Sequence, residues 1–183
     1  LMENKDLAFI LAGLGGGTGT GAAPVLARAA HESGALALCV ATMPFDFEGE
    51  APRQCAEQGL VDLRDAADAV IVVPNQRLFE MVGEGLAADQ VFAQANEILR
   101  HGIAGLWRMV VHRGMMSLSF ADLRMAVRNS GGTMVLGFGQ AEGPDRATKA
   151  AEIAVRSPLL DMGKTVARAD ALLVSIVGGP DIG

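Results

Sequence analysis

The stretch that most constrains this chain is a cluster of five glycines and two threonines, Gly15-Gly16-Gly17-Thr18-Gly19-Thr20-Gly21. It lies between an apolar run at residues 7–14 and an alanine-rich run at residues 22–30, so the sequence predicts a strand, a glycine turn and the start of a helix. Glycines allow positive φ angles and close backbone approach. The first amides of a helix have no partner within it and attract anions, of which phosphate is the usual one. In the alternative interpretation, the glycines only let a helix pack tightly on a sheet.

Three short apolar runs, at residues 7–14, 35–42 and 69–73, are separated by helix-like segments. This alternation is typical of βαβ units and a parallel sheet. The runs do not alternate with polar residues, which indicates helices on both faces of the sheet. Ligands of such sheets bind beyond the carboxyl ends of the strands. The glycine cluster, the loop at residues 43–49 and Pro74-Asn75 are therefore expected to face one crevice.

A helical stripe of apolar residues predicts one long helix from about Ala87 to Trp107. Beyond it we expect a helix that begins at Ser119 with Asp122 in its first turn. A strand at residues 133–138, a helix at 144–153 and a strand at 172–177 are expected to follow. The fold class is thus α/β: a partial Rossmann-like parallel sheet, joined by a long central helix to part of a second α/β domain.

Composition excludes several classes of partner. The chain has 183 residues, of which 50% are apolar and 20% charged, and its formal net charge is −6. No basic stripe is present to neutralise phosphates, so we expect neither nucleic acid nor direct membrane binding. Cys39, Cys55 and the three histidines lack metal-ligand spacing, which predicts reduced thiols, a cytoplasmic protein and no metal site of its own. Candidate strands close to both ends lead us to expect a piece of a longer polypeptide.

Several blocks of sequence resemble the tubulin/FtsZ family, in the order and spacing of bacterial FtsZ. They are the glycine cluster with Ala22-Ala23-Pro24-Val25, then Pro44-Phe45-Asp46-Phe47-Glu48-Gly49, Ala56-Glu57-Gln58-Gly59, Val73-Pro74-Asn75, Phe120-Ala121-Asp122, Ser157-Pro158-Leu159-Leu160 and Gly178-Gly179-Pro180-Asp181. The resemblance covers essentially the whole chain. It implies a GTP-binding protein of cell division, or of a related cytoskeletal role, that assembles head to tail with nucleotide between successive subunits.

The resemblance also implies an organisation and a ligand. Residues 1–86 correspond to the later part of a GTP-binding domain, 87–107 to the central helix, and 108–183 to the hydrolytic loop with the first part of a second domain. The ligand is GTP or GDP, with Mg²⁺ as a candidate companion ion. The partner is a second copy of the chain or an FtsZ-type protein.

The site residues follow position by position. The glycine cluster would cradle the phosphates, and the sugar and base contacts correspond to Glu48, Asn75, Phe92 and Glu97. Glu97 stands where FtsZ has an aspartate that reads guanine N–H groups, and its carboxylate lies one methylene further out. Three of the four have structural alternatives: Phe92 as a core side chain, Asn75 as a helix N-cap and Glu48 as a solvated turn carboxylate.

Hydrolysis in the family uses the loop after the long helix, which enters the nucleotide pocket of the next subunit. FtsZ has asparagine and aspartate at the positions of Ser117 and Ser119, so Asp122 is the remaining catalytic candidate and we expect a slow or absent GTPase. In the alternative interpretation Asp122 only caps its helix. Pro52 replaces an arginine near the γ-phosphate. Arg53 is the candidate substitute, although one helical step rotates a side chain by about 100°.

Two other functions are compatible with parts of this pattern. The changes at Pro52, Ser117 and Ser119 favour a non-catalytic relative that binds an FtsZ-type partner without nucleotide turnover. Residues 17–22 also fit the dinucleotide-binding pattern G-x-G-x-x-A, with Asp46 as a candidate ribose ligand. Asp46 lies beyond the end of the second strand, however, and no catalytic acid–base pair is apparent for an oxidoreductase.

Overall fold

The structure is a computed structural model, which describes residues 5–82, 88–111, 119–129, 133–157, 159–160 and 166–179. Parallel strands form one sheet in the order β1 (Leu7–Gly13), β2 (Leu36–Met43), β3 (Ala69–Pro74) and β4 (Thr133–Met134). Leu7 pairs with Leu36, Leu38 with Ala69, and Val70 with Thr133. The predicted α/β fold with its parallel sheet is confirmed.

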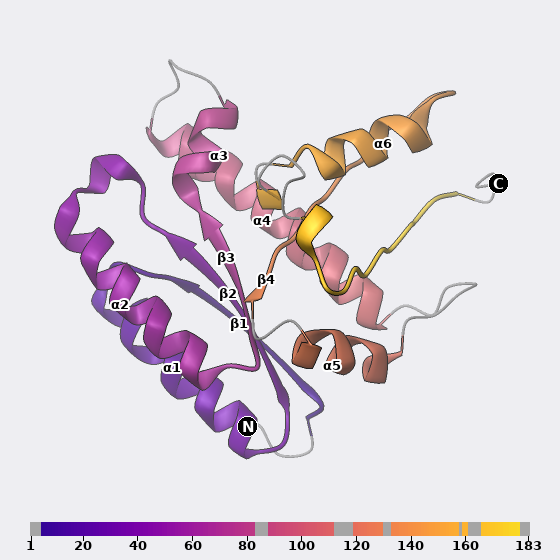
Figure 1. Ribbon diagram of the computed structural model, residues 1–183. Coiled ribbons are helices and arrows are strands. Elements are labelled where there is room, and N and C mark those ends of the chain that lie inside the picture. Colours follow the sequence, from indigo (N-terminus) through magenta and orange to yellow (C-terminus); the bar gives the residue numbers. More distant parts are fainter. Residues whose placement is uncertain are drawn as a thin grey trace.

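Helices cover both faces of this sheet. Helices α1 (Gly17–Glu32) and α2 (Glu50–Ala66) lie on one face, and α4 (Ala88–Val111) and α5 (Phe120–Asn129) lie on the other (Figure 1). The remaining elements are α3 (Asn75–Val82), α6 (Arg146–Val155) and the 3-10 turns η1 (Asp46–Glu48) and η3 (Val166–Arg168). The predicted long helix is confirmed as α4, which continues to Val111.

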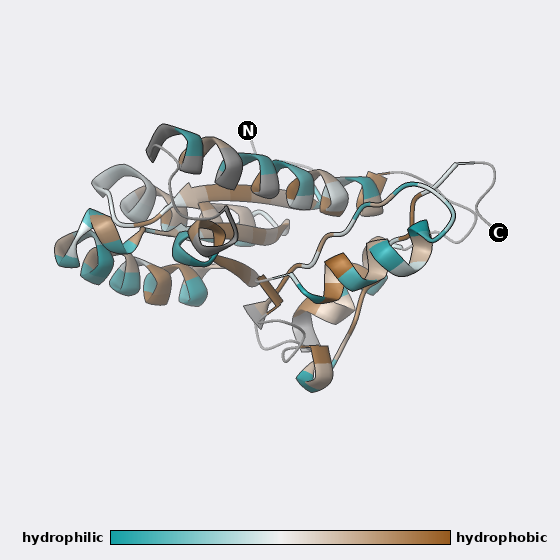
Figure 2. Cartoon of the chain, turned by 90° about the horizontal axis from the view of Figure 1, so that it is seen from above, coloured by the Kyte–Doolittle hydropathy of each residue, from teal (hydrophilic) through white to brown (hydrophobic). Residues whose placement is uncertain are grey.

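The side chains of β2 alternate between the helices on the two faces of the sheet. Its residues 36–41 are all buried. The small side chains of Ala37, Cys39 and Ala41 face α1 and α2, whereas the larger side chains of Leu36, Leu38 and Val40 face α4 and α5. Figure 2 shows the brown, hydrophobic strands between helices with teal outer turns. This continuous burial is what the unbroken apolar runs predicted.

Two strand predictions were wrong, one in part and one entirely. The strand expected at residues 133–138 ends at Met134, because the following segment packs against helices instead of continuing the ladder. A Cβ atom on Gly139 would overlap the carbonyl oxygen of Ala150 in α6, so only glycine permits this close approach. Residues 172–177 form no strand. No described strand pairs with them, and Ile176 is 80% exposed.

None of the helices in the described ranges has both the length and the apolar character needed to cross a bilayer.

Candidate functional site

The glycine cluster forms the turn between β1 and α1. Gly15 has a φ of +108°, which favours glycine, and its N–H donates a hydrogen bond to Thr20 Oγ1 at 2.9 Å. Gly16 precedes α1 in an extended conformation, and no side chain caps the helix there. The first amides of a 16-residue helix therefore open toward the carboxyl edge of the sheet, which is an anion-binding arrangement. The predicted strand, turn and helix are confirmed.

Helix α2 packs closely against this turn. A Cβ atom on Gly59 would overlap the Cγ2 methyl of Thr20, so the absence of a side chain lets α2 approach the turn closely. The Cys55 thiol lies 3.9 Å from Thr20 Oγ1. On the same helix, Pro52 packs against the glycine turn: a Cβ atom placed on Gly15 would lie 3.0 Å from the Pro52 carbonyl oxygen. The conformation of the turn thus depends on small or rigid residues of α2.

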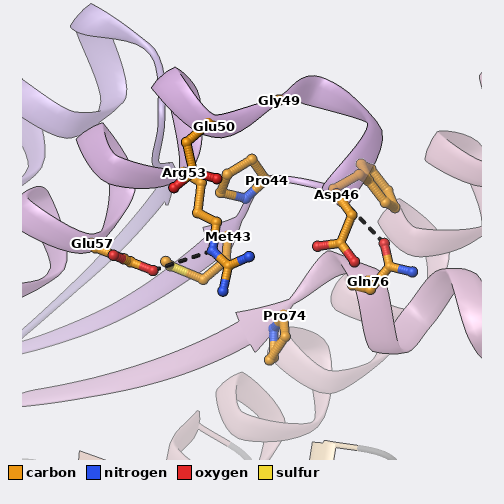
Figure 3. A pocket seen from close by; sticks show the side chains of 10 residues that line it. Met43, Pro44, Asp46, Gly49, Glu50, Arg53, Glu57, Pro74 and Gln76 are labelled. Carbon is orange, nitrogen blue, oxygen red and sulfur yellow. Dashed lines mark hydrogen bonds and ion pairs between the residues drawn. The ribbon is translucent and has the colours of Figure 1, made fainter.

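Arg53 points away from the contact that Pro52 makes. It lines a cavity of about 280 Å³ beyond the carboxyl ends of β2 and β3, together with Asp46, Glu50 and Glu57. Its Nε donates to Glu57 Oε1 at 3.3 Å, and Figure 3 shows the side chain extending from α2 into the pocket beside Glu57. Pro52, and not Arg53, therefore contacts the glycine turn. The structure assigns Arg53 to the neighbouring pocket.

The loop after β2 is closed by Glu48. One of its carboxylate oxygens accepts the Phe45 N–H at 2.7 Å, and the Asp46 N–H donates to Gln76 Oε1 at 3.2 Å. Gly49 then adopts a φ of +95° before α2 begins. Glu48 is exposed, yet it is more than a solvated turn carboxylate, because it holds the 3-10 turn in place.

Aromatic rings gather beside this loop. Phe45 is fully buried, and Phe47 stacks on it with ring centroids 4.9 Å apart. Phe92 of α4 meets the Phe45 ring edge-on at 4.8 Å and remains 41% exposed. The Phe92 ring is therefore partly packed against Phe45 and partly exposed to solvent. Sequence reasoning did not single out Phe47, which is 56% exposed; the signal was an aromatic residue between Asp46 and Glu48 in a loop at the ligand edge.

Asn75 begins α3 at the carboxyl end of β3. Its Oδ1 atom is buried and has no hydrogen-bond partner in the structure, so it does not cap the helix. A buried acceptor without a donor is uncommon in folded proteins and calls for an explanation. A ligand that brings an N–H or O–H group to this position would satisfy it.

Glu97 lies on α4 within a cluster of charged side chains. Arg100 Nε lies 3.0 Å from Glu97 Oε2 and 3.2 Å from Oε1, and Arg100 Nη2 lies 2.8 Å from Oε2. These hydrogen bonds are the main reason why the pKa of Glu97 is lowered and that of Arg100 is raised. Glu97 is therefore ionised near neutral pH, and Arg100 engages both of its carboxylate oxygens. The i,i+3 spacing of the pair was visible in the sequence.

Asp122 lies near the amino ends of the strands, opposite the glycine turn at their carboxyl ends. Its Oδ2 accepts the Ser119 N–H at 2.9 Å and the Ser119 hydroxyl at 2.6 Å, and these bonds lower its pKa. The capping role is thus present. Arg124 of the same helix donates to the Gly34 carbonyl, just before β2 begins, so α5 lies at the amino edge of the strands (Figure 1). The structure does not bring Asp122 to the glycine turn of its own chain. Ser117 lies outside the described residues.

In the described ranges, no group of three or more His, Cys, Asp or Glu side chains could hold a metal ion.

Comparisons with known proteins find relatives in both sequence and structure. The model of the tubulin/FtsZ family GTPase domain matches residues 1–83, and that of the FtsZ family C-terminal domain matches residues 132–183. The chain is 46% identical to cell division protein FtsZ 1 of Archaeoglobus fulgidus, covering 100% of this chain and 48% of the relative. It is 44% identical to cell division protein FtsZ of Rickettsia bellii, over 99% of this chain and 39% of the relative.

A solved structure of an empty FtsZ dimer from M. jannaschii has a TM-score of 0.82 and 38% identity to this chain. The alignment covers 87% of this chain and 46% of that one. The chain thus spans less than half the length of the relatives it matches.

Proposed function

This chain belongs to the tubulin/FtsZ family, and from that premise we propose that it is part of an FtsZ-like cytoskeletal protein of cell division. The protein binds GTP or GDP in the cytoplasm and assembles head to tail. We retain residues 1–86, 87–107 and 108–183 as the nucleotide-binding part, the central helix and the part that contains the hydrolytic loop.

The observation that carries this proposal is the open amino end of α1 beyond β1. Gly16 and Gly17 leave space around the first turn, since a Cβ atom on either would meet nothing within 4 Å. Phosphate oxygens need such close access to backbone amides. A magnesium ion would arrive with the phosphates and neutralise part of their charge.

The sugar and base are assigned to the neighbouring residues. The unpartnered Asn75 Oδ1 accepts a hydrogen bond from the nucleoside, the exposed face of Phe92 stacks with the base, and Glu97 accepts from guanine N–H groups. Glu48 holds the loop beside the sugar. Arg53 lies in the adjacent pocket and is a weaker candidate for contact with the phosphates, because Pro52 separates it from the contact at Gly15.

The separation of the two sites supports head-to-tail assembly. The glycine turn lies at the carboxyl ends of the strands and Asp122 near their amino ends, an arrangement in which Asp122 would serve the nucleotide of a neighbouring copy. Ser119 lacks a charge, and Asp122 is already hydrogen-bonded to it, which supports weakened hydrolysis. The same observation favours the second candidate, a non-catalytic module that binds an FtsZ-type partner.

Calorimetry on the full-length protein tests the nucleotide site. We expect GTP and GDP to bind with Kd values on the order of micromolar. Gly17→Ala should weaken both by at least about tenfold, because its methyl group takes the space that phosphate oxygens need. Gly105→Ala is the matched control, since its Cβ atom also meets nothing within 4 Å but lies on α4. No heat with either nucleotide, or equal affinity in the Gly17 and Gly105 variants, would contradict the proposed site.

A further inference from the structure

The loop that carries Phe47 begins beside the glycine turn. A Cβ atom on Gly15 would lie 3.5 Å from Pro44 Cγ, so the start of the loop packs against the turn. The Leu14 N–H also donates to the carbonyl oxygen of Thr42, near the end of β2, at 2.9 Å. Side chains on this loop therefore lie next to the proposed phosphate site.

The backbone on both sides of Phe47 is fixed. The Glu48 N–H donates to the Phe45 carbonyl oxygen at 3.0 Å, and the Asp46 N–H donates to Gln76 of α3 at 3.2 Å. Phe47 is nevertheless 56% exposed. The turn thus sets the direction of the Phe47 ring without burying it in the core.

Three other rings lie around Phe47. It stacks on Phe45 with ring centroids 4.9 Å apart and an interplanar angle of 12°. It meets Phe79 of α3 edge-on at 6.4 Å and Phe92 of α4 edge-on at 6.3 Å. Stacked and edge-on pairs at these distances are the favourable arrangements of aromatic rings. Phe47 therefore links the loop to both helices.

Phe92 is held by rings of this loop. It meets Phe45 at 4.8 Å with an interplanar angle of 82°, and Phe47 at an angle of 86°. The contact with Phe45, two residues beyond the end of β2, places Phe92 at the carboxyl ends of the strands. A partly exposed side chain that a ligand must order reduces affinity, and neighbours that order it beforehand remove this cost.

We propose that Phe47 is a positioning residue of the nucleotide site, which holds the Phe92 ring in the orientation in which it stacks with the base. This inference rests on the proposed function, in which the exposed face of Phe92 meets the base. Phe47 acts through Phe92 and does not itself contact the nucleotide. Phe45 supplies the buried part of the same support, and Phe47 supplies the exposed part.

The test uses Phe47→Leu in the full-length protein, which keeps an apolar side chain and removes the ring. Calorimetry should show GDP binding about twofold to tenfold more weakly than in wild type, the range that one aromatic pair supports. Phe47→Tyr keeps the ring, and its added hydroxyl can reach water because the side chain is more than half exposed. This variant should bind GDP as wild type does.

A double-variant cycle with Phe92→Leu tests the route of the effect. In the Phe92→Leu background, Phe47→Leu should cause no further loss of GDP affinity, because no ring is left to position. An equal loss in both backgrounds would mean that Phe47 acts on the nucleotide or on the loop itself. That result would refute the positioning role.

Phe138→Leu is the matched control. Phe138 is 41% exposed, and it stacks on His101 from the segment after β4. Its replacement should leave GDP affinity unchanged, and a loss equal to that of Phe47→Leu would contradict a specific role for Phe47. If wild-type protein binds GDP and Phe47→Leu binds it equally well, the positioning role is refuted and the proposed function stands. If wild-type protein binds no guanine nucleotide, the proposed function itself fails.

Discussion

The Ser119 hydroxyl donates a hydrogen bond to Asp122 Oδ2 at 2.6 Å, and the Asp122 N–H donates back to Ser119 Oγ at 3.2 Å. This exchange closes the first turn of α5 and engages the carboxylate that the proposed hydrolytic site would use. The two residues would therefore link helix capping with the proposed hydrolysis. A change at Ser119 should alter both, but in separable ways.

Ser119→Asp should raise the rate of phosphate release in the full-length protein. Aspartate caps helices about as well as serine, so α5 is retained. The substitution removes the hydroxyl donor that lowers the pKa of Asp122 and adds a second negative charge, so that pKa rises. Two carboxylates can orient water or a cation against the neighbouring nucleotide, and we expect an increase of at least about tenfold in steady-state turnover.

Ser119→Ala is the control for this prediction. It removes the cap without adding a charge, so thermal stability should fall and turnover should stay low. If Ser119→Asp and Ser119→Ala release phosphate at the same rate, the charge at this position does not limit hydrolysis. The non-catalytic interaction module would then be the better description.

The contact between Gly59 and Thr20 supports a second prediction. A Cβ atom on Gly59 would overlap the Thr20 methyl group, so Gly59→Ala should lower the free energy of unfolding by about 1–3 kcal/mol. Thr20→Ser removes that methyl and keeps the hydroxyl that accepts the Gly15 N–H. The double variant should therefore regain most of the lost stability. Urea unfolding of the four proteins measures the coupling, and additive effects would contradict the contact.

The sequence predicted the elements whose evidence is local. The continuous apolar runs of β1, β2 and β3 and the glycine turn were all found where expected, because burial on both faces and positive φ leave a direct signature. The run at residues 172–177 has the same apolar character and forms no strand. Strand formation there depends on a hydrogen-bonding neighbour, which local sequence does not specify.

The site shows the same division. The resemblance identified Asn75 and Glu97 as ligand candidates, but the unpartnered Oδ1 atom of Asn75 appears only in three dimensions. The i,i+3 spacing of Glu97 and Arg100 suggested a pair, and the structure shows that Arg100 contacts both carboxylate oxygens. The direction of Arg53 also needed the structure. The sequence shows only that Arg53 points about 100° around the helix from Pro52, which does not specify what it contacts. In the structure, the Arg53 side chain lies in the pocket with Glu57.

The two cysteines differ in environment, and this difference gives a pH prediction. Burial, with a smaller contribution from Asp68, raises the pKa of the Cys39 thiol from 9.0 to about 12, whereas Cys55 is exposed beside Thr20. In the unfolded chain Cys39 ionises at lower pH than in the folded chain. The folded state therefore keeps its full advantage below pH 9.0 and loses it as pH rises toward about 12.

Thiol labelling and unfolding measurements check this difference. At pH 8, a thiol reagent should react with the native chain at Cys55 and leave Cys39 unmodified until the protein unfolds. Between pH 9 and pH 11, the free energy of unfolding should fall more steeply in the Cys55→Ala variant, which retains Cys39, than in the Cys39→Ala variant, which lacks it. Each variant provides the control for the other. Rapid native labelling of Cys39, or equal pH slopes with and without it, would mean that the thiol is not held neutral in the space between β2 and the helices α1 and α2.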